Sequence, residues 1–140
     1  MPFRSFNDLV DDAKRRIHEI DVDELAELME PGSDVPELLV IDVREADERG
    51  RGFIPGSMGI PRGVLERDIA KLAFAGTVGE GDLGRPIVCV CAGGARSALA
   101  ADALRAMGFT NVQSLAGGFG AWGKAGRPVE HPRSGNTEPG

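Results

Sequence analysis

The chain has 140 residues, and its 16 lysine and arginine residues against 22 aspartate and glutamate residues give a formal net charge of −6. That length suits one domain, and 41% apolar residues are enough to build its core. The negative net charge counts against general nucleic-acid binding. No apolar run approaches the roughly 20 residues of a membrane-spanning helix. The N-terminal segment is polar from its eighth residue on, unlike a secretory signal. We therefore expect a cytoplasmic protein that binds neither nucleic acid nor membrane.

The chain opens with two predicted helices. Each begins with a capping-box pattern, in which an acidic residue follows the cap residue by three positions: Ser5 with Asp8, and Asp21 with Glu24. A Pro-Gly pair ends the second helix. Apolar residues at helical spacing predict the buried face of the first helix; they are Phe6, Leu9, Val10, Ala13 and Ile17.

Apolar runs further along the chain predict strands that alternate with helices. Residues 38–41 and 86–90 are short continuous apolar runs, which are typical of strands buried on both faces of a parallel sheet. Residues 111–115 are a weaker strand. Residues 64–73 and 97–107 are expected to be helices, the second closed by a glycine. This order predicts an α/β fold with a parallel sheet flanked by helices.

The chain is predicted to hold one domain. It spans residues 1–130, with an N-terminal helix within residues 1–16, and neither repeats nor a long linker divide it. Residues 131–140 carry almost no apolar side chain, so we expect them to form a disordered tail.

Two strands of the predicted sheet end in residues that can carry chemistry, Asp42 and Cys91. Ligands of open α/β sheets sit beyond the carboxyl ends of the strands. After Cys91, small residues and two glycines let backbone N–H groups converge, and the next helix adds its positive end. Arg96 adds a permanent charge. Such a loop stabilises an anion and the thiolate, which is the reactive form of cysteine.

The other cysteine, Cys89, lies inside the predicted strand and is expected to be part of the core. The two cysteines are one residue apart, which suits neither a disulfide framework nor a zinc site. Neither His18 nor His131 lies where the sequence would pair it with a nucleophile. We therefore predict a reduced protein with one reactive thiol and no metal.

Four motifs in order resemble those of the rhodanese-homology domain, the sulfurtransferase module. The resemblance extends from about residue 17 to residue 130. The motifs are Asp42-Val43-Arg44-Glu45 with Glu48, residues 52–57 with Ile60-Pro61, the loop Cys91 to Ser97, and Gly117-Gly118-Phe119 through Trp122. The resemblance implies a central parallel five-stranded sheet flanked by helices.

The resemblance also implies a ping-pong transfer of sulfur. Cys91 would be the catalytic nucleophile that takes sulfur from a small anionic donor such as thiosulfate, becomes a persulfide and passes sulfur to cyanide, a thiol or an accepting protein. No cofactor is implied. Asp42, Arg44 and Glu48 would shape the site, with Arg44 and Glu48 as an ion pair. The loop residues that would hold the anion or persulfide are Ala92, Gly93, Gly94, Ala95, Arg96 and Ser97.

Two positions depart from the family pattern. Phe53 stands where the family usually has histidine, and Arg49 stands where it often has tyrosine or phenylalanine. Neither position carries the nucleophile, so the departures leave the expected chemistry in place.

Several alternatives remain at this point. Phosphatases and arsenate reductases of the same fold use a cysteine–arginine loop one residue longer than the six residues from Cys91 to Arg96. A carrier fed with sulfur by a partner protein has the same motifs as a free-standing enzyme, whereas binding modules of this fold usually lack the cysteine. The small side chains of the loop predict an open pocket. The oligomeric state is not indicated.

Overall fold

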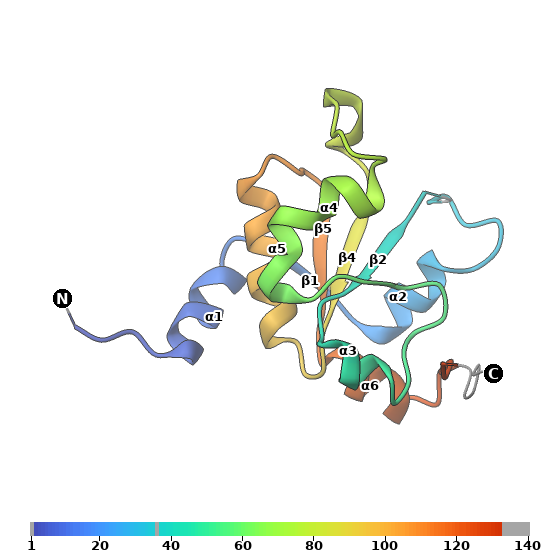
Figure 1. Cartoon of the computed structure of the whole chain (residues 1–140). Helices are drawn as coiled ribbons and strands as arrows, with labels where there is room; N and C mark the ends of the chain where they lie inside the picture. Colours follow the sequence, from blue (N-terminus) through green and yellow to red (C-terminus); the bar gives the residue numbers. More distant parts are fainter. Residues whose placement is uncertain (1, 36, 133–140) are drawn as a thin grey trace.

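The computed structural model describes residues 2–35 and 37–132. It contains a five-stranded, all-parallel sheet with the strand order β1-β5-β4-β2-β3, which confirms the predicted fold (Figure 1). The strands are β1 (His18–Ile20), β2 (Leu39–Asp42), β3 (Met58–Gly59), β4 (Ile87–Val90) and β5 (Val112–Leu115). The helices are α1 (Phe6–Lys14), α2 (Val22–Leu28), α3 (Ala46–Arg49), α4 (Leu65–Ala73), α5 (Ala95–Ala106) and α6 (Gly118–Lys124), with 3-10 turns η1 (Arg62–Val64) and η2 (Glu80–Asp82).

Both predicted capping boxes are present. The Ser5 hydroxyl accepts from the Asp8 N–H at 3.1 Å, and the Asp8 carboxylate accepts from the Ser5 N–H at 2.9 Å. Asp21 and Glu24 make the same pair of bonds at 2.8 and 2.9 Å. These bonds satisfy N–H groups that have no partner inside the helix, so the helices begin where the sequence predicts.

The sheet is covered on both faces, which explains the continuous apolar runs of its central strands. Side chains of β2 and β4 alternate between the two faces. Ile41 and Cys89 pack under α4 and α5, whereas Val40 and Val88 pack against α2 and α6. All eight residues of β2 and β4 are buried, as expected for a parallel sheet between two layers of helices.

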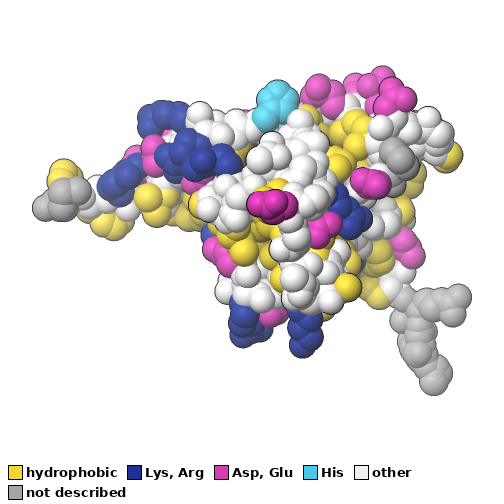
Figure 2. Space-filling view, turned by 90° about the horizontal axis from the view of Figure 1, so that it is seen from above, with side chains coloured by type: hydrophobic (Ala, Val, Ile, Leu, Met, Phe, Trp, Pro, Cys, Tyr) yellow, Lys and Arg dark blue, Asp and Glu magenta, His cyan; other side chains and the backbone are white. Residues whose placement is uncertain are grey.

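The first helix is less buried than its apolar stripe predicts. Of its residues only Val10 and Ala13 are buried, while Phe6 and Leu9 are 53% and 44% exposed. The helix packs chiefly against α5, and the chain before it projects from the body of the protein (Figure 2). The stripe is therefore longer than the surface available to cover it.

Three short elements have no strong sequence signal. The strand β1 has three residues and β3 has two, and neither contains an apolar run. Their pairing with β5 and β2 makes them strands. The helix α3 has four residues. Of the predicted tail, only His131 and Pro132 are described; residues 133–140 lie outside the described part of the chain.

The carboxyl ends of the strands gather the residues singled out by sequence. The chain leaves β2 at Asp42 and β4 just before Cys91, and both α3 and α6 lie at this end of the sheet (Figure 1). Phe53 and Glu130 form an antiparallel bridge that ties the last described segment to the loop after α3. In the described residues no helix is both long and apolar enough to cross a bilayer.

Replacement of Ile69 by alanine tests the packing of α4. Ile69 is fully buried in the core, so Ile69→Ala should lower the free energy of unfolding by about 2–4 kcal/mol. Leu72 of the same helix is 46% exposed, and Leu72→Ala should change it by less than about 0.5 kcal/mol. Urea unfolding measures both, and equal losses would contradict the observed orientation of the helix.

Candidate active site

Cys91 is the first residue after β4, and its sulfur is held by backbone N–H groups. The Sγ atom accepts hydrogen bonds from the N–H of Gly94 at 3.1 Å and from that of Ser97 at 3.3 Å. Gly94 precedes α5 with a φ of +103°, a conformation that favours glycine. The turn therefore directs the free N–H groups at the start of a twelve-residue helix toward the sulfur.

Two buried hydroxyl groups form a hydrogen-bonded chain that starts at the Cys91 sulfur. The Ser97 Oγ lies 3.4 Å from the Cys91 Sγ and 2.8 Å from the Ser114 Oγ. Both serines are fully buried, so these contacts satisfy hydroxyl groups that water does not reach. Ser114 comes from β5, beside β4 in the sheet. Sequence reasoning missed Ser114, although a serine inside a strand of a buried sheet is itself a signal.

The segment at the start of α6 fixes the end of β4. The Phe119 N–H donates to the Cys91 carbonyl oxygen at 2.7 Å, and the Gly120 N–H donates to that of Ala92 at 3.0 Å. A Cβ atom on Gly118 would lie 2.4 Å from the Cys91 carbonyl oxygen. Only glycine fits at this position, which explains part of the glycine-rich C-terminal motif.

Asp42 and Arg44 form a buried ion pair. Arg44 donates from Nη2 to Oδ2 of Asp42 at 2.9 Å and from Nε to Oδ1 at 3.1 Å. Its Nη2 also donates to the Gly52 carbonyl at 2.8 Å, and its guanidinium lies 4.3 Å from the centre of the Phe119 ring. Asp42 is 1% exposed and Arg44 5%. The pair joins the end of β2 to the loop after α3 and to α6.

The expected ion pair between Arg44 and Glu48 is wrong. Glu48 instead accepts from Nη1 and Nη2 of Arg96, at 2.8 and 2.9 Å. Arg44 folds back onto Asp42, whereas the Glu48 carboxylate also accepts from the Glu45 N–H at the start of α3. The Arg96 guanidinium and this N–H lower the pKa of Glu48 to about 2. The pair ties the Cys91 loop to α3.

The two positions that depart from the family pattern contact each other. The guanidinium of Arg49 lies 4.4 Å from the centre of the Phe53 ring, an attractive cation–π distance. Arg49 also donates to Asp42 Oδ2 at 3.1 Å. The carboxylate of Asp42 therefore accepts hydrogen bonds from two arginines, Arg44 and Arg49. Sequence reasoning did not place Arg49 in this cluster.

The side chain of Cys91 is buried, since the residue is only 1% exposed. Its sulfur lies within the turn that holds it. Ala92 and Gly93 are exposed, whereas Gly94 and Ser97 are buried. Cys89 is fully buried as predicted, and burial raises the pKa of its thiol to about 12. Over residues 2–35 and 37–132, no three or more His, Cys, Asp or Glu side chains form a group that could hold a metal.

Comparison with known proteins agrees with this geometry. The family model of the rhodanese-like domain matches residues 21–125. The chain belongs to the rhodanese-like domain family. This rhodanese-like chain is 32% identical over 106 residues to thiosulfate sulfurtransferase GlpE of Shewanella oneidensis. The match covers 76% of this chain and 92% of the relative.

Two solved structures show the same fold. One, from Rhodopseudomonas palustris, is described as a protein of unknown function and possible tyrosine phosphatase. It matches with a TM-score of 0.77 and 33% identity, over 93% of this rhodanese-like chain and 99% of that one. The other, a thiosulfate sulfurtransferase from Pseudomonas aeruginosa, has a TM-score of 0.72 at 28% identity. That match covers 89% of this chain and 22% of the other.

The replacement Glu48→Gln tests the link between α3 and the Cys91 loop. Because the folded protein holds the pKa of Glu48 near 2, the unfolded chain binds this proton first as the pH falls. The contribution of Glu48 to stability is therefore complete above about pH 4.5 and is lost as the pH falls toward 2. Urea unfolding should show Glu48→Gln less stable by about 1 kcal/mol at pH 6, a difference that shrinks below pH 4.5.

Asp47→Asn is the matched control, since the side chain of Asp47 on the same helix is 77% exposed. It should show no such pH dependence. A difference between wild type and Glu48→Gln that stays constant from pH 6 to about pH 2.5 would contradict the ion pair.

Proposed function

We propose that the protein moves sulfane sulfur from a small anionic donor such as thiosulfate to a thiophilic acceptor, through a persulfide on Cys91. Its general activity is that of a rhodanese-type sulfurtransferase. The observation that carries the proposal is the pair of N–H bonds, from Gly94 and Ser97, to the Cys91 sulfur. Hydrogen bonds to a charged group each contribute about 1.5–3 kcal/mol, so this turn favours a sulfur anion.

In the first step the Cys91 thiolate attacks the outer sulfur of thiosulfate. A bond forms between Sγ and that sulfur, and the bond between the two sulfur atoms of thiosulfate breaks. Its electron pair leaves with sulfite. The product is a persulfide whose terminal sulfur carries the negative charge, and the N–H groups of Gly94 and Ser97 would stabilise that charge.

In the second step the acceptor takes the terminal sulfur. Cyanide or a thiolate attacks that atom, the bond to Sγ breaks, and its electron pair restores the Cys91 thiolate. Thiocyanate or a new persulfide leaves. The enzyme returns to its starting state without an external oxidant or reductant, which is why the reaction needs no resident cofactor.

Buried hydroxyls help to accommodate the change of charge at the sulfur. Ser114 can donate to Ser97, which frees the Ser97 hydrogen to donate to the thiolate or persulfide. The bond to Glu48 holds Arg96 at the edge of the loop and keeps the turn in place. Asp42 and Arg44 act as scaffold rather than as reacting groups, since both are buried and paired with each other.

The second candidate is a phosphatase, favoured by the description of the Rhodopseudomonas palustris structure. Two observations count against it. The loop from Cys91 to Arg96 has six residues, one fewer than the loops that encircle a tetrahedral oxyanion. The Arg96 Nη1 and Nη2 atoms are both bonded to Glu48 rather than turned into the loop.

Paired cysteine variants test the proposed nucleophile. Cys91→Ala should abolish thiocyanate formation from thiosulfate and cyanide, by roughly a thousandfold or more, because the atom that forms the persulfide is gone. Cys89→Ala also removes a sulfur atom from the hydrophobic cluster that contains Cys91. This variant should keep most of the wild-type rate, since the raised pKa of Cys89 leaves its thiol protonated. Thiocyanate is measured colorimetrically.

Circular dichroism of both variants shows whether they are folded. Equal loss in two folded variants would contradict the role of Cys91. If the wild type releases the phenol from an aryl phosphate and forms no thiocyanate, the protein is a phosphatase instead.

A further inference from the structure

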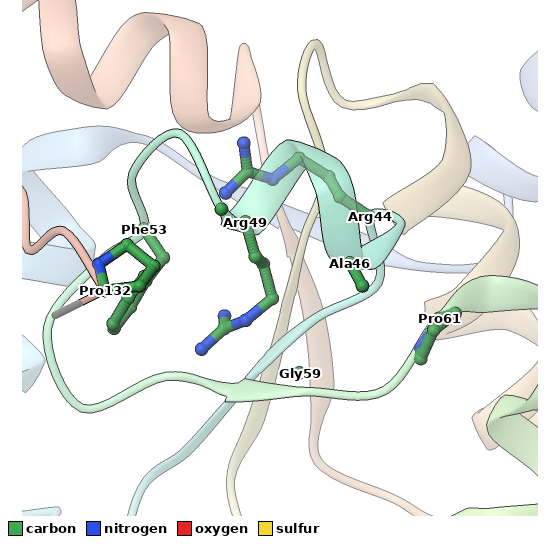
Figure 3. A pocket seen from close by; sticks show the side chains of 8 residues that line it. Arg44, Ala46, Arg49, Phe53, Gly59, Pro61 and Pro132 are labelled. Atoms are coloured by element: carbon green, nitrogen blue, oxygen red, sulfur yellow. The ribbon is translucent and has the colours of Figure 1, made fainter. Parts of the chain in front are cut away.

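A cavity lies beside α3, at the carboxyl ends of β2 and β3. Its volume is about 410 Å³, within the range of small-molecule sites. Cys91 does not line it; the lining includes Arg44, Arg49, Phe53, Gly59, Pro61 and Pro132 (Figure 3). We propose that this cavity binds a small organic carboxylate with an apolar body, held by the guanidinium of Arg49. The proposed sulfur transfer at Cys91 does not use this site.

The side chain of Arg49 is packed between Phe53 and Gly59. The ring of Phe53 lies 4.4 Å from the guanidinium carbon. A Cβ atom on Gly59 would lie 2.7 Å from Cδ and Nε of Arg49, so the glycine lets the strand backbone approach. Figure 3 shows the side chain of Arg49 extending between these two residues. A guanidinium held in this way loses little conformational entropy when it binds a ligand.

The hydrogen bonds of Arg49 leave one edge of the guanidinium for a ligand. Nη1 donates to Asp42 Oδ2 at 3.1 Å and to Ser57 Oγ at 3.0 Å, and Nη2 donates to the Ser57 carbonyl at 3.2 Å. Within the described part of the chain, no acceptor bonds Nε. Nε–H and the second N–H of Nη2 form the fork that binds a carboxylate through two parallel bonds.

The charges around the cavity favour an anion. Arg44 and Arg49 are among the lining residues, and no Asp or Glu is. Figure 3 shows the side chain of Arg49 extending into the space, whereas the guanidinium of Arg44 points away from it. Both arginines bond the single carboxylate of Asp42, which is 1% exposed. The three side chains carry a net charge of +1. A carboxylate bound at Arg49 would neutralise this charge where water is partly excluded.

The other walls favour an apolar body on the ligand. Phe53, Pro61 and Pro132 present apolar surface, and Ala46 adds a methyl group. A flat carboxylate such as benzoate can place its two oxygens on the guanidinium fork and its ring against these side chains. A neutral compound of the same shape could make only the apolar contacts.

Titration with benzoate, followed by ¹⁵N–¹H correlation spectra, tests the proposal. Benzoate should bind with a Kd of about 1 mM and shift the amide signals of Gly50 and Gly59, which line the cavity. Benzamide, the neutral analogue, should bind at least roughly tenfold more weakly. Arg49→Gln should weaken benzoate by roughly tenfold or more, because the fork is lost. Asp42 keeps its bonds to Arg44 in this variant.

The matched control is Arg51→Gln, since the side chain of Arg51 is 72% exposed and does not line the cavity. It should bind benzoate as the wild type does. Gly59→Ala provides a second variant that keeps the charge of Arg49 but displaces its side chain, and it should also weaken binding.

Each of three results with the ligands and variants would overturn the proposal, as would a fourth with the wild type alone. They are benzoate binding that is unchanged in both Arg49→Gln and Gly59→Ala, equal affinity for benzoate and benzamide, and shifts confined to the Cys91 loop. Absence of any shift with the wild type up to about 20 mM benzoate would do so too.

Discussion

The site depends on a buried sulfur atom that receives hydrogen bonds from the backbone at the start of a helix. Two structural conditions make those bonds possible. Gly94 adopts a φ of +103°, which turns the chain from β4 into α5, and Gly118 has no side chain, which lets the start of α6 approach the Cys91 carbonyl. The Ser97 hydroxyl also contacts the sulfur, and the Ser114 hydroxyl in turn bonds that of Ser97. The Cys91 sulfur therefore receives two backbone hydrogen bonds, from Gly94 and Ser97.

Charged side chains around the site form two separate groups, and α3 connects them. Glu48 faces the loop and pairs with Arg96, whereas the next residue, Arg49, faces Asp42 on the other side. The first group is neutral. The second, with Arg44, carries one excess positive charge beside a cavity. Adjacent residues of one short helix thus serve the nucleophile loop and a distinct candidate binding site.

Local signals in the sequence predicted much of the fold, and they placed Cys91 at the end of a strand, where the structure has it after β4. The apolar runs of β2 and β4 and the capping boxes at Ser5 and Asp21 depend on neighbouring residues, so the pattern was sufficient. The edge strands β1 and β3 were not predicted, because pairing with other strands defines them. The partners of Glu48 and the contact of Ser114 with the loop were also missed. These depend on side chains that are distant in the sequence and meet only in the folded chain.

Intact-mass spectrometry after incubation with thiosulfate, and then with cyanide, tests the central claim most directly. The folded protein should gain the mass of one sulfur atom, peptide mapping should place it on Cys91, and cyanide should remove it as thiocyanate. The absence of a gain in a folded protein with a free Cys91 thiol, or a gain on Cys89, would contradict persulfide formation in the Cys91 turn.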